Sequence, residues 1–167
     1  MEKKRSWLRP VFTIVVFSLL GAFLIYLIYD MLFVPKIAFS EPNVLENYAY
    51  DTPYYVGNVV NKEGFLSPTV EKVRFYSGTR LLTSQDISLY LYKDATEPTL
   101  TSDPAVFGGQ LISAESEKLP STPFQLIYLI HVTPDNEWAL RSVHMQITFS
   151  YFGIIQKDQH YTISLLS

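Results

Sequence analysis

The sequence predicts an all-β domain, an immunoglobulin-like antiparallel β-sandwich of about seven strands, preceded by one N-terminal transmembrane helix. Three observations predict this arrangement. A stretch of uncharged residues lies near the N-terminus, at 11–29. From residue 51 onward, short segments in which apolar and polar residues alternate recur between turn residues. No long helical pattern interrupts these segments, as expected for two packed antiparallel sheets.

The uncharged stretch is long enough to cross a membrane, because at about 1.5 Å rise per residue its helix covers nearly the whole ~30 Å bilayer core. Residues 1–10 carry four basic side chains and one acidic, whereas Lys36 is the first basic residue after the stretch. Since basic flanks stay on the cytoplasmic side, we expect the domain to be extracytoplasmic, on the cell membrane. The expected organisation is a cytoplasmic tail at 1–10, a transmembrane helix at 11–34, a stalk at 35–50 and the sandwich at 51–167.

A cleaved signal peptide is the competing interpretation, but its apolar region runs only about 7–15 residues and ends at small residues. The stretch here is longer and no such site follows it, so we expect an uncleaved signal anchor. Asp30 would lie at the headgroup level, where we expect it to be hydrated. Ser18, Gly21 and Ala22 form a surface of small residues that permits association with another helix. The chain has no cysteine, which excludes disulfides and lipid attachment through a thiol.

Seven segments rich in β-branched and aromatic residues are the expected strands: 54–61, 70–76, 87–93, 106–113, 124–133, 143–151 and 161–166. In the stalk, Ser40 is suited to cap a single helical turn. The fifth and sixth segments are expected to pair as a hairpin around a loop at 134–137. In that register three apolar pairs face each other on one side: Phe124 and Ile147, Leu126 and Met145, Tyr128 and Val143.

Two segments carry a resemblance to a known family. YVGNVVNK at 55–62 and VEKVRFYSG at 70–78 resemble the paired strands of small bacterial FxLYD-type domains and the related late-embryogenesis sandwiches. There, a V-x-G-x-V-x-N strand precedes a strand that ends in an aromatic pair and a turn glycine. The resemblance implies an anchored envelope module without known catalytic residues, and it supports the fold more than any activity.

The motifs of common chemistries are missing from the sequence. The seven glycines form no phosphate-cradling pattern, no G-x-S-x-G elbow is present, and without cysteine there is no thiol nucleophile. His131 and His144 would lie about 13 Å apart on the expected hairpin, too far to share a zinc ion. We expect His160 to be solvated. We therefore expect no catalytic residues, no metal and no cofactor.

Four carboxylates gather near two expected turns: Asp86, Asp94, Glu97 and Asp103. Loop carboxylates of extracellular sandwiches can bind calcium, but the spacing of a calcium loop is absent, so we expect these residues to be solvated. Residues 36–167 carry 9 basic and 14 acidic side chains, an acidic balance that argues against a nucleic-acid partner.

Four tyrosines occur within eight positions where the expected stalk joins the expected sandwich: Tyr48, Tyr50, Tyr54 and Tyr55. Tyrosine offers apolar contact area with a polar tip, which favours an exposed surface for a protein, sugar or lipid partner. The alternative is that these residues pack an edge strand, since tyrosine is favoured in strands and Pro53 suits an edge.

The leading hypothesis is a non-enzymatic, single-pass envelope protein whose sandwich binds another protein or a component of the cell surface. A second hypothesis is an accessory subunit of a membrane complex that acts through its transmembrane helix. A hydrolase on a sandwich scaffold is the third.

Overall fold

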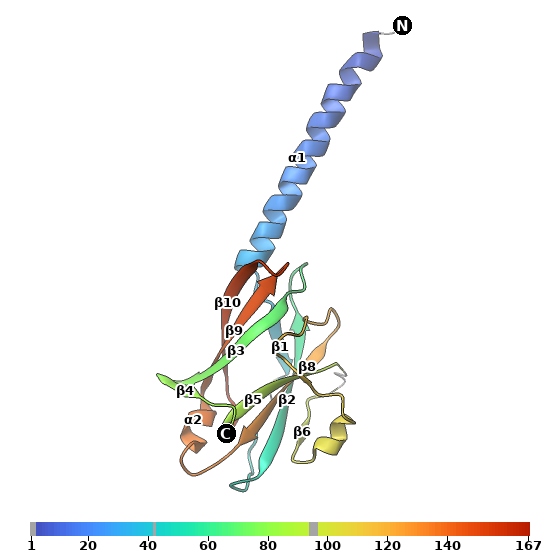
Figure 1. Cartoon of the computed structure of the whole chain (residues 1–167). Helices are drawn as coiled ribbons and strands as arrows, with labels where there is room; N and C mark the ends of the chain where they lie inside the picture. The colour runs from blue at the N-terminus through green and yellow to red at the C-terminus, as the bar shows by residue number, and fades with distance from the viewer. Residues whose placement is uncertain (1–2, 42, 94–96) are drawn as a thin grey trace. The chain divides into compact units, whose positions relative to one another are not determined.

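The computed structural model describes residues 3–41, 43–93 and 97–167. The chain forms two compact units, a helix unit (residues 1–34 and 64–66) and a two-sheet domain (residues 35–63 and 67–167). The elements in chain order (Figure 1) are α1 (Lys3–Phe33), β1 (Ile37–Glu41), β2 (Pro53–Lys62), β3 (Thr69–Ser77), β4 (Arg80–Leu82), β5 (Ile87–Tyr92), β6 (Leu100–Thr101), η1 (Pro104–Phe107), β7 (Ile112–Ser113), β8 (Phe124–His131), α2 (Glu137–Arg141), β9 (Val143–Tyr151) and β10 (Ile155–Ile163).

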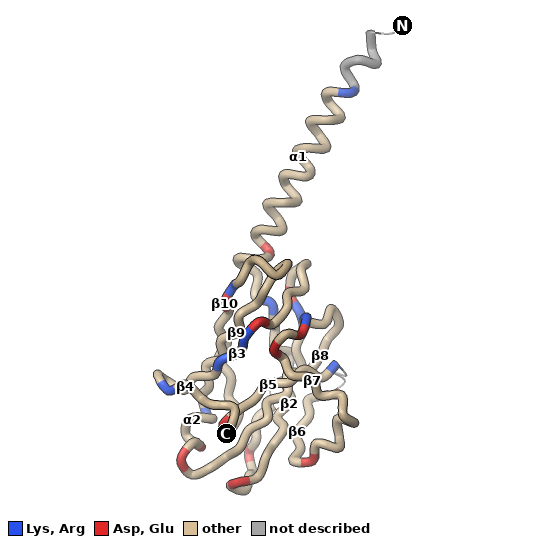
Figure 2. Tube along the Cα trace, in the orientation of Figure 1, with Lys and Arg blue, Asp and Glu red and all other residues tan. Residues whose placement is uncertain are grey.

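The helix unit contains a helix long and apolar enough to span a membrane. Within its segment Arg9–Phe33, the most apolar 18-residue window has a mean hydropathy of 2.7, and no residue of that window is buried. Charged residues of the described part of α1 lie only near its two ends (Figure 2). A helix that is apolar all round and uncovered by protein has the character of a membrane span. The helix already begins at Lys3, within the segment expected to be a tail.

Asp30, near the end of α1, is buried rather than hydrated. Its two carboxylate oxygens accept hydrogen bonds from the backbone N–H groups of Phe65 (2.8 Å) and Leu66 (3.1 Å). Only 1% of the residue is exposed. The expectation of a solvated headgroup-level aspartate is therefore wrong, because a loop distant in sequence supplies the hydrogen bonds that water would otherwise make.

Two antiparallel sheets form the two-sheet domain. The six-stranded sheet has the order β1-β2-β8-β5-β7, with β6 paired to β2. The four-stranded sheet has the order β10-β9-β3-β4. Their inner faces meet, as shown by the rings of Phe75 in β3 and Tyr128 in β8, whose centroids lie 6.3 Å apart. Most of the buried apolar side chains come from these inner faces, as alternation predicts.

The expected stalk is part of the six-stranded sheet. Residues Ile37–Glu41 form β1 and pair with the end of β2 at Val59–Lys62. Leu45 is buried and bridges to Leu166. The expectation that residues 35–50 form a stalk outside the sandwich is therefore wrong. It failed because β1 is only five residues long, which is too short for an alternating apolar pattern to be recognised in the surrounding sequence.

The expected hairpin of residues 124–151 is also wrong in its pairing. β8 lies between β2 and β5, whereas β9 lies between β3 and β10 in the other sheet. The six side chains assigned to the buried face are nevertheless all buried: Phe124, Leu126, Tyr128, Val143, Met145 and Ile147. Alternation identifies which residues of a strand are buried, but it does not identify the strand's partner. Two strands in opposite sheets that face each other across the core bury the same alternate residues as two strands paired in one sheet.

Two other expected strands differ from the structure. In the expected segment 106–113, a 3-10 helix at Pro104–Phe107 and a turn replace most of the strand, leaving β7 with two residues. Asp103 caps the 3-10 helix, its carboxylate accepting from Ala105 N–H at 2.9 Å. The last strand, β10, ends at Ile163 and begins six residues earlier than expected. Its first residues are too exposed and polar to show an apolar alternation.

The strand β8 is largely buried on both faces. Its inner face packs in the core, while residues of the segment 97–107 lie near its outer face around Gln125. There Gly57 N–H donates to the carbonyl of Thr99 at 2.6 Å, and the carboxamide oxygen of Gln125 accepts from Thr99 N–H at 3.1 Å. The ring of Phe107 contacts those of Tyr55 and Tyr92 on this side.

Candidate functional site

A short helix, α2, brings together the polar and aromatic groups of the candidate site, and Asn136 holds it in place. The buried Asn136 side chain donates to a carboxylate oxygen of Asp86 and to the carbonyl of His131, both at 2.9 Å. It also accepts from Thr133 N–H at 2.9 Å. One carboxamide thus joins the loop before α2 to the turn before β5, which fixes where α2 begins.

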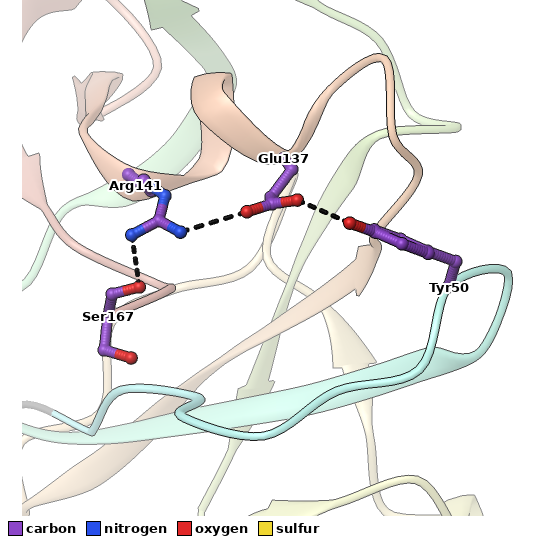
Figure 3. Close-up of polar contacts among 4 residues, drawn as sticks. All are labelled: Tyr50, Glu137, Arg141 and Ser167. Atoms are coloured by element: carbon purple, nitrogen blue, oxygen red, sulfur yellow. Dashed lines mark hydrogen bonds and ion pairs between the residues drawn. The ribbon is translucent and has the colours of Figure 1, made fainter.

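Glu137, the first residue of α2, bridges two segments that are distant in sequence (Figure 3). One carboxylate oxygen accepts from the hydroxyl of Tyr50 at 2.7 Å. The other accepts from the Arg141 guanidinium at 3.0 Å, a pair spaced one helical turn apart. Arg141 in turn donates to the main-chain oxygen of Ser167 at 2.5 Å.

The electrostatics of this network favour a charged Glu137. Hydroxyl groups of Tyr50 and Tyr48, together with the Arg141 guanidinium, lower the pKa of Glu137 to about 2. The carboxylate in return raises the pKa values of both tyrosines above their usual range. At neutral pH the site therefore holds a carboxylate, a guanidinium and two protonated phenols, a set that can exchange hydrogen bonds with a partner.

Exposed aromatic side chains lie beside the Glu137–Arg141 ion pair. Tyr50 is 48% exposed and Trp138, next to Glu137 in α2, is 57% exposed. The rings of Tyr48 and Tyr50 meet edge to face with centroids 6.1 Å apart. We call Tyr48, Tyr50, Glu137, Trp138 and Arg141 the far-end patch.

The far-end patch lies at the opposite end of the two-sheet domain from Lys36. At the Lys36 end, the Lys36 carbonyl accepts from Glu63 N–H at 3.1 Å and the Lys36 ammonium lies 5.8 Å from the ring centre of Tyr151. We call this the entry end, because the chain enters the domain there. Tyr151 closes β9, and α2 directly precedes the start of β9 at Val143. At about 3.3 Å per residue, roughly 26 Å separates the two ends (Figure 1).

The four predicted tyrosines do not form one surface. Tyr48 and Tyr50 belong to the far-end patch, but the half-buried Tyr54 accepts from Ala49 N–H through its hydroxyl at 2.9 Å. Tyr55 packs against Phe107 on the outer face of the sheet, with centroids 5.4 Å apart. Moreover β2 is an internal strand, paired with β8 along its length, so the edge-strand explanation is wrong.

Sequence reasoning missed Glu137, Trp138 and Arg141. A detectable signal was present, since glutamate four residues before arginine stabilises a helix. The proline and the two polar residues at 134–136 instead pointed to a hairpin loop, in which no helix was expected. Asn136 was seen only as a turn residue, although its side chain makes three hydrogen bonds.

The small residues proposed for helix association lie on one face of α1. Ser18 and Ala22 are exposed, and a Cβ atom added at Gly21 would find no atom within 4 Å. That face of the helix unit is open among the described residues, and association through it stays a prediction.

The histidines do not share the arrangement expected from sequence. His131 lies in β8 and His144 in β9, in different sheets, so their placement on one hairpin face is wrong. The ring of His144 contacts the hydroxyl of Thr162 at 3.1 Å. His160 lies within β10, opposite Gln146, and is exposed. In the described ranges 3–41, 43–93 and 97–167, no three His, Asp or Glu side chains gather to hold a metal ion.

The loop carboxylates serve the fold individually. Asp86 accepts from the backbone and hydroxyl of Thr83 and from Asn136. Loss of hydration raises its pKa, but these hydrogen bonds outweigh that effect, and the pKa of Asp86 lies below its ordinary value. Asp103 caps the 3-10 helix, whereas Asp94 falls outside the described residues.

An open cavity of about 580 Å³ lies between the β3–β4 edge of one sheet and β5 of the other. It is open because β4 and β7 have only three and two residues. Its lining mixes apolar side chains such as Leu82 and Leu89 with Arg74 and Glu115. The carboxylate of Glu115 is engaged by the N–H of Val73 at 3.1 Å.

Comparison with known proteins finds no matching family model, no matching curated protein and no matching solved structure. The resemblance of residues 55–78 to FxLYD-type domains therefore stays a prediction.

Proposed function

We propose that this protein is a single-pass membrane protein with a cytoplasmic N-terminus and an extracytoplasmic, immunoglobulin-like β-sandwich. The sandwich acts as a non-catalytic module that binds a protein or surface component through the far-end patch. The resemblance to anchored FxLYD-type envelope domains agrees with this function. The observation that carries the proposal is the exposed aromatic and charged set around Glu137, at the end of the domain opposite its entry from the helix.

The topology is supported by the charge on either side of the apolar helix. Four basic residues precede the span and Lys36 alone follows it closely, a distribution that favours a cytoplasmic N-terminus. The mean hydropathy of 2.7 for an 18-residue window within Arg9–Phe33 favours insertion of the uncharged part of this helix.

The composition and rigidity of the far-end patch support binding. Tyrosine, tryptophan and arginine are the residue types that dominate the energy of protein interfaces. Here Tyr50 and Arg141 are held by Glu137, so little side-chain freedom is lost when a partner binds. The exposed faces of Tyr50 and Trp138 remain available for contact.

Site-specific photo-crosslinking in intact cells that produce the protein tests this function. A photoreactive phenylalanine replaces Tyr50 or Trp138, and the matched control replaces Leu81, which is 56% exposed but outside the patch. We expect discrete crosslinked products from positions 50 and 138 and none at the same size from position 81. No products from positions 50 and 138, or the same products from all three positions, would contradict binding through the patch.

An accessory subunit that acts through its transmembrane helix is a second candidate function. The observation in its favour is the open face at Gly21, where an added Cβ meets nothing. Replacing residues 11–29 by an unrelated span that lacks small residues distinguishes the two. Loss of function in that chimera, with the crosslinks from position 50 retained, would favour the helix as the working surface.

A further inference from the structure

The entry end of the two-sheet domain carries an exposed apolar turn. Residues 152–154 join β9 to β10, and Phe152 and Ile154 are 74% and 84% exposed, the most exposed large apolar side chains of the described residues. No charged residue occurs between Tyr151 and Gln156, and the trace of this turn carries no charge in Figure 2. Adjacent exposed apolar side chains are a feature of surfaces that contact membranes or other proteins.

The backbone of this turn is an unusual setting for a bulky residue. Ile154 N–H donates to the carbonyl of Tyr151 at 3.1 Å, and the two residues between them, Phe152 and Gly153, have φ values of 56° and 70°. Turns with two positive φ values normally take Asn-Gly or Gly-Gly. An aromatic residue there costs conformational energy.

A second apolar loop directly follows Glu63 in the chain. Gly64–Leu66 belongs to the helix unit, and its Phe65 ring meets the rings of Phe23 and Tyr26 edge to face, at 6.3 and 6.4 Å. Phe65 is 62% exposed in spite of these contacts. Phe23 precedes Asp30 by seven residues, about 10 Å along the helix axis, so Phe65 lies alongside the apolar part of α1 rather than beyond it.

The length of chain fixes how far the entry end can be from the end of α1. Only Val34 and Pro35 lie between Phe33 and Lys36, and the three Cα–Cα steps reach at most about 11 Å. The Lys36 ammonium in turn lies 5.8 Å from the ring of Tyr151, the residue before the exposed turn. The exposed turn therefore adjoins Lys36, the residue at which the chain enters the domain, three positions after α1 ends.

We propose that residues 152–154 and the loop Gly64–Leu66 insert into the outer half of the lipid bilayer, giving the protein two lipid contacts in addition to its span. This inference rests on the proposed function, because it requires α1 to cross the membrane. The occupant is lipid, since the loops are uncharged and apolar at their tips, Phe65 contacts aromatic residues of the apolar helix, and the entry end begins three residues after α1 ends. Insertion holds the entry end against the membrane and directs the far-end patch away from it.

Single-cysteine variants of the full chain test the insertion, because the chain has no cysteine of its own. The variants Ile154→Cys and Phe65→Cys report on the two loops, and Leu81→Cys, 56% exposed, is the matched control. Leu20→Cys, within α1, reports on the span itself. Each is labelled with the fluorophore NBD and reconstituted in phosphatidylcholine nanodiscs with or without nitroxide-labelled lipid. Far-UV circular dichroism confirms that each variant keeps the wild-type fold.

We expect nitroxide lipid to quench the fluorophore at positions 154, 65 and 20 at least twofold, with a blue-shifted emission, and to leave position 81 unchanged. Aqueous iodide should quench position 81 alone. If position 20 is quenched but positions 154 and 65 behave like position 81, α1 crosses the membrane and the proposed insertion of the two loops is wrong. Shielding of position 154 from both quenchers would mean a protein partner or second copy covers the turn, which also overturns it. If position 20 is not quenched, the membrane anchoring fails and the insertion fails with it.

Discussion

Glu137 of α2 accepts a hydrogen bond from the hydroxyl of Tyr50, a residue 87 positions earlier in the chain, at 2.7 Å. The contact joins the segment before β2 to the helix before β9. It also places an exposed aromatic ring beside the Glu137–Arg141 ion pair. The far-end patch is therefore a feature of the tertiary structure, assembled from segments that no local sequence window contains.

The far-end network is expected to respond to pH. The pKa of Glu137 is about 2 in the folded chain, below its ordinary value of 4.5, so its contribution to stability is present above pH 4.5 and is lost as the pH falls toward 2. Glu137→Gln should flatten this part of the profile of melting temperature against pH. Tyr50→Phe, which keeps the ring but removes the hydroxyl donor, should flatten it in part. Profiles of both variants that superimpose on wild type between pH 2 and 5 would show that the network does not form.

Asn136 is expected to be the most sensitive polar residue of the far end. Asn136→Ala leaves buried groups of Thr133, His131 and Asp86 without their partner and should cost about 2–4 kcal/mol of unfolding free energy. Asn136→Asp places a second carboxylate against Asp86 and should be worse at pH 7 than at pH 4, where protonation relieves the repulsion. Chemical denaturation of the full chain in detergent measures both. A loss below about 0.5 kcal/mol for Asn136→Ala would contradict this role.

Adjacent positions of β9 should respond oppositely to the same substitution. Met145 is fully buried, so Met145→Asp buries an unpaired charge and should abolish folding of the two-sheet domain. His144 is exposed, so His144→Asp should change the melting temperature little. Near-UV circular dichroism and thermal melting compare the two variants. Equal damage from both would refute the burial pattern of this strand.

A soluble fragment is expected to need β1. Residues 35–167 should fold as a β-rich domain with cooperative melting, because they include all strands of both sheets. A fragment that begins at Val44 lacks β1 and leaves the Val59–Lys62 edge of β2 unpaired. We expect it to melt at lower temperature and to aggregate more readily, as measured by circular dichroism and light scattering. Identical behaviour of the two fragments would show that β1 contributes little to the sheet.

The sequence was informative where the physical signal is local. Charge and hydropathy identified the apolar helix, and alternation identified the main strands and the buried faces of residues 124–128 and 143–147. The sequence did not show which strands pair with each other. Residues 134–142 are long enough either to turn back in one sheet or to cross to the other, and alternation is the same in both cases.

The candidate site was predictable only in part, because its residues come together through tertiary contacts that the sequence does not show. A cluster of tyrosines is visible in sequence, but its division among the far-end patch, the Ala49–Tyr54 turn and the outer face near Phe107 depends on tertiary contacts. The same holds for Asp30, whose partners Phe65 and Leu66 lie 35 and 36 positions away. Hydrogen bonds across such separations leave no periodic signal in the chain.

The central claim, an anchored protein with its two-sheet domain outside the cell membrane, is tested most directly by cysteine accessibility in intact cells. Leu81→Cys and Glu2→Cys, each the only cysteine of its full-length chain, are treated with a membrane-impermeant maleimide before and after permeabilisation. The account predicts that Leu81→Cys reacts in intact cells and that Glu2→Cys reacts only after permeabilisation. Labelling of Glu2→Cys in intact cells, with Leu81→Cys protected until the cells are opened, would contradict it.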